Sequence, residues 1–178
     1  MEYEVQIRPG VSVVETIFNY VVDTFSEPSF LVYLGFALGV AILIVIIMVR
    51  NSVLLEYEEK FGHPNIVIMI FMTIGFAIVF AVLAYESIKI EKMLFWVYLI
   101  VLGFWLLWAV ALFFSRFERG SPLIFATVFF LSVLYYSLLI ISRDIKYLSW
   151  CSICLLWALY TVYYTFVISR HPWTPLIN

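Results

Sequence analysis

The chain is 178 residues long, with 65% hydrophobic residues, 12% charged residues and a formal net charge of −2. A soluble domain carries roughly 45–50% apolar and about 25% charged residues, so this composition excludes an ordinary water-soluble domain and indicates a chain solvated by lipid. The near-neutral charge, with no basic patch, also excludes nucleic-acid binding. We therefore expect one all-α, polytopic membrane bundle with no second domain.

Residues 1–29 form the first predicted unit, ahead of the membrane. Within it, residues 11–25 (VSVVETIFNYVVDTF) place apolar side chains on one helical face and Glu15, Asn19 and Asp23 on the other. Three polar groups in so short a segment argue against a membrane span. The segment therefore predicts an N-terminal amphipathic helix that lies at the membrane interface.

The membrane unit covers residues 30–169 and contains five predicted transmembrane helices. Each is an uncharged stretch of the length, about 20 helical residues, that crosses a hydrocarbon core of about 30 Å. Their predicted bounds are 30–49, 66–85, 93–115, 122–142 and 147–169. Only residues 143–146 separate the last two spans, which predicts an antiparallel hairpin of adjacent helices. Residues 170–178 contain two prolines and predict an extended C-terminal tail.

The distribution of lysine and arginine gives no orientation for this bundle. If the N-terminus lies outside, five of these residues fall in the inner segments and five in the outer ones. The positive-inside rule therefore favours neither orientation. The chain is predicted to be a multi-pass protein of the cell membrane, with its orientation left open.

The first span contains Gly35 and Gly39, four residues apart in the order LGFALG. Glycines at this spacing remove side chains from one ridge of a helix and let another helix approach closely. We expect a close helix contact at this ridge, inside the chain in preference to self-association. The alternative is that these glycines only reflect the frequency of glycine in spans.

The last span carries polar, aromatic and thiol side chains along one helical stripe. Because polar groups within a membrane usually face protein, we expect this stripe to face the bundle. Together with Tyr135 and Tyr136 of the preceding span, it predicts a pocket for an apolar, lipid-like ligand. The alternative is that the hydroxyls bond to one another and to backbone carbonyls. Members of the stripe recur at spacings of four and three residues: Trp150, Cys154, Trp157, Thr161 and Tyr164.

Cys151 and Cys154 are the only cysteines and stand three residues apart at the start of the last span. Thiols at this spacing can close a disulfide with modest distortion, and a helix N-terminus favours the thiolate that disulfide exchange requires. A structural role is the alternative, because free cysteine is also an ordinary small residue between helices. Two thiols are too few for a zinc site, and His63 and His171 lie outside the spans, so we expect no metal site.

The last hairpin, residues 121–164, resembles the final two helices of the vitamin K epoxide reductase family. The resemblance is carried by the C-x-x-C pair that opens the last span and by the aromatic span before it. It implies a four-helix bundle around a quinone, with Cys154 proximal to the quinone, Cys151 as its disulfide partner, and Trp157 and the tyrosines around the ring. The family's second cysteine pair has no counterpart in residues 51–65, so electrons would come from a separate thiol partner.

The predicted spans contain no ionisable residue, which disfavours ion transport and charged substrates. We therefore expect a non-catalytic membrane component: a subunit or scaffold of a membrane complex, or the binder of an apolar ligand. Its expected partners are the lipid bilayer and either another membrane protein or a second copy, through Gly35 and Gly39. The alternative is a quinone-linked thiol–disulfide oxidoreductase that uses Cys151 and Cys154, with quinone as its cofactor.

Overall fold

A computed structural model describes residues 27–114 and 121–170 of the chain, apart from residues 51–65. The predicted interfacial helix of residues 11–25 and the predicted tail of residues 171–178 lie outside the described residues.

The described residues form an all-α bundle without strands. Five helices are long and apolar enough to cross a membrane, which confirms the predicted fold class. A short 3-10 helix, η1, precedes the last of them. In chain order the elements are α2 (Pro28–Arg50), α4 (Ile66–Ile90), α5 (Leu94–Phe114), α6 (Ser121–Ile141), η1 (Ile145–Tyr147) and α7 (Leu148–Arg170).

Local sequence signals account for most of the helix ends. Pro28 and Pro122 fall in the first turns of α2 and α6, where a missing backbone N–H removes no helical hydrogen bond. Asp144 caps η1, because its side chain accepts a hydrogen bond from the backbone N–H of Lys146 at 3.0 Å. The Asp144 cap lies in the short turn between α6 and α7 that the sequence predicts.

The end of α4 differs from the prediction. The helix continues five residues beyond the predicted end at Tyr85, as far as Ile90. Glu86 and Lys89 in this extension pair across one turn at 3.1 Å. A charged residue that the sequence places just beyond the span therefore lies within the helix.

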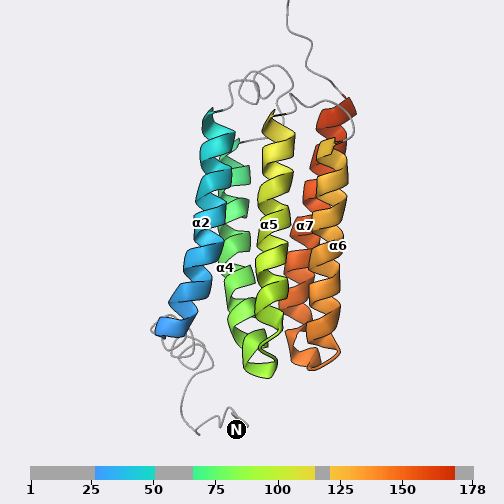
Figure 1. Ribbon diagram of the computed structural model, residues 1–178. Helices are drawn as coiled ribbons and strands as arrows, with labels where there is room; N and C mark the ends of the chain where they lie inside the picture. The colour runs from blue at the N-terminus through green and yellow to red at the C-terminus, as the bar shows by residue number, and fades with distance from the viewer. Residues whose placement is uncertain (1–26, 51–65, 115–120, 171–178) are drawn as a thin grey trace, which may run out of the picture.

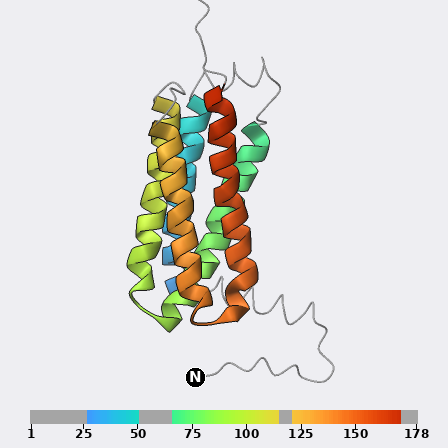
Figure 2. The ribbon, with the colours of Figure 1, turned by 90° about the vertical axis from the view of Figure 1, so that its right-hand side faces the viewer.

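The five long helices run in alternating directions (Figure 1). Helix α2 packs against α4, α4 against α7, α7 against α6, α6 against α5, and α5 against α2. Figure 2 shows α7 between α6 and α4. The predicted hairpin of the last two spans is confirmed, because α6 and α7 lie side by side.

Helices α2 and α4, which pack against each other, both bury alanines. Ala37 and Ala41 are fully buried on α2, and Ala77, Ala81 and Ala84 are fully buried on α4. Small side chains let two helices approach closely where lipid provides no hydrophobic driving force between them. Alanine, and not glycine, is therefore the small residue that α2 buries inside the bundle.

Gly35 and Gly39 lie on the exposed face of α2. A Cβ atom built at either glycine meets no described atom within 4 Å. The expectation of a close helix contact at this ridge inside the chain is therefore wrong for the described residues. Self-association through these glycines stays a prediction.

Candidate functional site

The predicted stripe on α7 faces the interior over most of its length. Cys154, Trp157, Thr161 and Tyr164 are all buried, and so is Cys151. Trp150, at the start of the stripe, is 38% exposed. Trp150 shares the helical face of Cys154 but lies in the first turn of α7, near the end of the bundle, so it is partly exposed and is not part of the interior site.

The two tyrosines predicted to complete the pocket separate in the structure. Tyr136 is fully buried, whereas Tyr135 is 59% exposed on the outer face of α6. Adjacent residues of a helix are about 100° apart, so only one of the pair can face the bundle. The inclusion of Tyr135 in the site is therefore a wrong prediction.

The thiols lie beside a group of buried hydroxyls where α4, α6 and α7 meet. The Sγ atom of Cys151 lies 4.0 Å from the carbonyl oxygen of Ser137, and both thiols are free. Tyr136, like both cysteines, is fully buried, and it precedes Ser137 in α6. Its hydroxyl is 2.7 Å from the Ser87 Oγ, which in turn donates to the Ala84 carbonyl at 2.9 Å.

This thiol–hydroxyl cluster (Ser87, Tyr136, Ser137, Cys151 and Cys154) contains no charged side chain. A thiolate is stabilised by a neighbouring cation or imidazolium, and none belongs to the cluster. The two thiols are also fully buried. Their surroundings are those of cysteines packed between helices.

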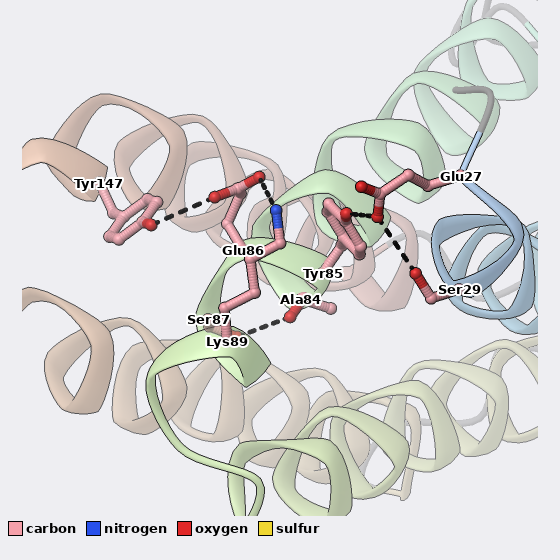
Figure 3. A network of polar contacts seen from close by, with 8 residues as sticks. All are labelled: Glu27, Ser29, Ala84, Tyr85, Glu86, Ser87, Lys89 and Tyr147. Carbon is pink, nitrogen blue, oxygen red and sulfur yellow. Dashed lines mark hydrogen bonds and ion pairs between the residues drawn. The ribbon is translucent and has the colours of Figure 1, made fainter. Parts of the chain in front are cut away.

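A layer of polar contacts closes the end of the bundle next to the thiols (Figure 3). Tyr85 donates a hydrogen bond to Glu27, which joins α4 to the start of α2. Tyr147 donates to Glu86 at 3.4 Å, which joins η1 to α4. The Nζ atom of Lys89 lies 3.9 Å from the centre of the Tyr85 ring and also pairs with Glu86.

The connections between helices at this polar end are tied as well. Arg143, after α6, pairs with Glu91, between α4 and α5, at 3.2 Å. Lys146 pairs with Asp144 at 2.8 Å. Hydrogen bonds from the side chain and the backbone of Lys146 hold the pKa of Asp144 below its usual value. These contacts hold the connections at the polar end in place. The thiols lie at least one helical turn further inside the bundle.

A second cluster lies further along the bundle and is entirely aromatic. The ring of Phe76 on α4 lies 4.7 Å from Trp105 on α5, 5.9 Å from Phe129 on α6 and 6.2 Å from Trp157 on α7. Trp105 and Phe129 also stack on each other, with ring centroids 6.2 Å apart. We call these four residues the central aromatic cluster; each of them is at most 5% exposed.

Buried polar atoms at this cluster have no hydrogen-bond partner among the described residues. They are the Nε1 atoms of Trp105 and Trp157 and the Oγ1 of Thr73, which lies one turn before Phe76 on α4. Leaving a buried donor unpaired costs about 1–3 kcal/mol. Trp108 on α5 shows the ordinary arrangement, because its Nε1 donates to the Thr165 Oγ1 at 2.8 Å.

The sequence singles out Trp157 but assigns no role to Phe76, Phe129 or Thr73. Phenylalanine and threonine are ordinary residues of a span, so their identity carries no signal. The only sequence signal is the depth of Trp105, since tryptophans that anchor a span sit near its ends. The packing of α4 against both α7 and α5 is needed to find the site, and no single helix reveals it.

No group of three or more histidine, cysteine, aspartate or glutamate side chains could hold a metal ion in the described part of the chain. Comparison of the chain with known protein families, with curated proteins and with solved structures finds no match. The resemblance of the last hairpin to the vitamin K epoxide reductase family therefore stays a prediction. The site must be interpreted from its own chemistry.

Proposed function

We propose that this chain is a non-catalytic protein of the cell membrane that binds an uncharged, apolar ligand at the central aromatic cluster. The observation that carries this proposal is that Trp105, Trp157 and Thr73 have buried polar atoms with no hydrogen-bond partner among the described residues of an apolar bundle. Buried polar groups in proteins nearly always have a partner. A ligand with acceptor atoms facing α4, α5 and α7 would provide hydrogen-bond partners for these three side chains.

The surroundings of these donors fit a binding site better than a reaction centre. The aromatic rings that pack around Phe76 carry no acid, base or thiol. Ligand sites are commonly apolar with a few well-placed polar groups, and they occur between the helices of bundles. A binding function requires no catalytic group among these residues.

The alternative proposal, a quinone-linked thiol oxidoreductase, is favoured by one observation. Cys151 and Cys154 are buried together beside Tyr136, near the polar end. Two thiols and a quinone would give a disulfide and a hydroquinone, with both protons and both electrons passing to the quinone. A dithiol of a partner protein would then have to reduce the disulfide, because the chain has only two cysteines.

The topology weakens this alternative. Residues 51–65 follow the end of α2 at Arg50 and precede the start of α4 at Ile66. Cys151 lies at the opposite end of the bundle, next to the polar end where α4 finishes. The helix ends that flank residues 51–65, where the family's second cysteine pair is expected, therefore lie at the end of the bundle away from Cys151. We keep the binding function as the conclusion.

The test is a search for the ligand in protein purified from membranes in mild detergent. Organic extraction followed by mass spectrometry should recover one apolar compound at about one molecule per chain. Trp157→Phe should retain less of it, because this change removes a donor while keeping an aromatic ring. Trp96→Phe is the matched control, since Trp96 is 65% exposed and outside the cluster. Equal recovery from all three proteins, or no such compound, would contradict the proposal.

A further inference from the structure

The indole N–H groups of the central aromatic cluster that have no described partner determine which chemical groups the ligand must offer. An indole N–H donates and does not accept, so an acceptor atom is needed at Trp105 and at Trp157. We infer that the ligand is an uncharged, planar ring compound whose carbonyl oxygen accepts hydrogen bonds from these indoles. This inference rests on the proposed function and goes beyond it by naming the class of compound.

The distribution of charge excludes an ionic ligand. The charged side chains of α2 and α4 lie near the helix ends, at Arg50, Glu86 and Lys89, and α5 and α6 have none. A carboxylate or an ammonium group among Phe76, Trp105 and Trp157 would have no counter-ion within the cluster. Such a group is costly to bury in a membrane interior without a partner. A neutral carbonyl provides the acceptor without that cost.

The arrangement of the rings favours a flat molecule. Trp157 stacks on Tyr160 with an interplanar angle of 26°, and Tyr160 stacks on Tyr164 at 20°. Trp105 and Phe129 are also stacked, at 14°. A planar ring can extend such stacking, which contributes binding energy beyond the burial of apolar area. A branched or flexible chain would bury area without this contribution.

The experiment compares two probes of nearly equal shape, fluorene and fluorenone, which differ by one carbonyl group. The full chain is placed in lipid nanodiscs after organic extraction and reconstitution, with isotope-labelled tryptophan, and the indole N–H resonances are followed by NMR. After correction for partition into lipid, fluorenone should bind about tenfold more tightly than fluorene, as expected for hydrogen bonds of ordinary net strength. Fluorenone should also move the Trp105 and Trp157 resonances downfield.

Internal controls distinguish a hydrogen bond from fluorenone to the two indoles from a nonspecific effect of fluorenone on all indole resonances. The Trp108 resonance should stay in place, because its indole is already bonded to Thr165. Trp157→Phe should reduce the preference for fluorenone, and Trp96→Phe should keep it. Fluorenone carboxylate should bind more weakly than fluorenone, since the cluster contains no cation.

Four results would overturn the inference. They are equal affinity for fluorene and fluorenone, unchanged indole resonances on fluorenone binding, equal affinity for the carboxylate, and binding of neither ring probe. In the ligand-free chain, indole resonances of Trp105 and Trp157 already as far downfield as that of Trp108 would overturn it too. Equal affinity for fluorene and fluorenone, unchanged indole resonances or binding of neither probe would leave the proposed function standing, and the extraction of a bound compound tests it separately. Indoles that are already hydrogen-bonded in the ligand-free chain would also remove the observation on which the proposed function rests.

Discussion

The hydrogen bond between Tyr136 and Ser87 gives a prediction in which the direction of donation decides the outcome. Both side chains are fully buried, and the two oxygens are 2.7 Å apart. Ser87 has one hydroxyl proton and donates it to the Ala84 carbonyl at 2.9 Å, so Tyr136 must be the donor to Ser87. The two residues of this pair are therefore not equivalent.

Removing the donor should cost less than removing the acceptor. In Tyr136→Phe, Ser87 keeps its bond to Ala84, and the free energy of unfolding should fall by about 1 kcal/mol. In Ser87→Ala, the Tyr136 hydroxyl remains buried without its acceptor, and the loss should be about 2 kcal/mol. The double variant should lose less than the two single changes together, because it leaves no unpaired hydroxyl.

Reversible unfolding in mixed micelles, followed by circular dichroism as the SDS fraction rises, measures these differences. Ser132→Ala is the control, because the Ser132 hydroxyl donates only to the Phe129 carbonyl of its own helix. Its loss should be close to zero. A larger loss for Tyr136→Phe than for Ser87→Ala, or strictly additive losses, would refute the assigned direction of donation.

Three further predictions concern the glycine ridge, the thiols and the turn before α7. Gly39→Ala should keep or raise the unfolding free energy, by up to about 1 kcal/mol, because alanine is the better helix former and the added Cβ meets no described atom; a clear loss in the same micelle assay would point to a partner at that face. Changing Cys151 and Cys154 to Ser should leave the amount of extracted ligand unchanged, whereas loss of a quinone-dependent thiol oxidation would support the redox alternative. Asp144→Asn should be less stable than the parent chain at pH 6. Since the folded-state pKa of Asp144 lies below its usual value of 3.8, that difference should shrink as the pH falls below about 4; a difference that is constant with pH would contradict the carboxylate's role.

The number and the approximate bounds of the spans could be predicted because lipid imposes a simple requirement on sequence. A helix in hydrocarbon must be apolar for about 20 residues, and this pattern is visible without knowledge of neighbouring helices. The error at the end of α4 has the same origin. Glu86 marks the end of the apolar stretch, but its pairing with Lys89 and its contact with Tyr147 keep the helix going to Ile90.

The faces of the helices were harder to predict than their bounds. In water, the polar side of a helix identifies its exposed face, whereas in lipid both faces are apolar. Trp150, Tyr135 and the glycines of α2 were therefore placed inside by spacing or residue type, and all of them are exposed. The central aromatic cluster depends on which helices are neighbours, and no local pattern at Phe76 or Trp105 encodes that.

Native mass spectrometry of the full chain released from nanodiscs tests the central claim most directly. The account predicts one extra mass per chain that survives the collision energies that remove annular lipid, that is retained by Trp96→Phe, and that is reduced in Trp157→Phe. A chain that carries only lipid-derived masses, in the same amounts for all three proteins, would contradict it.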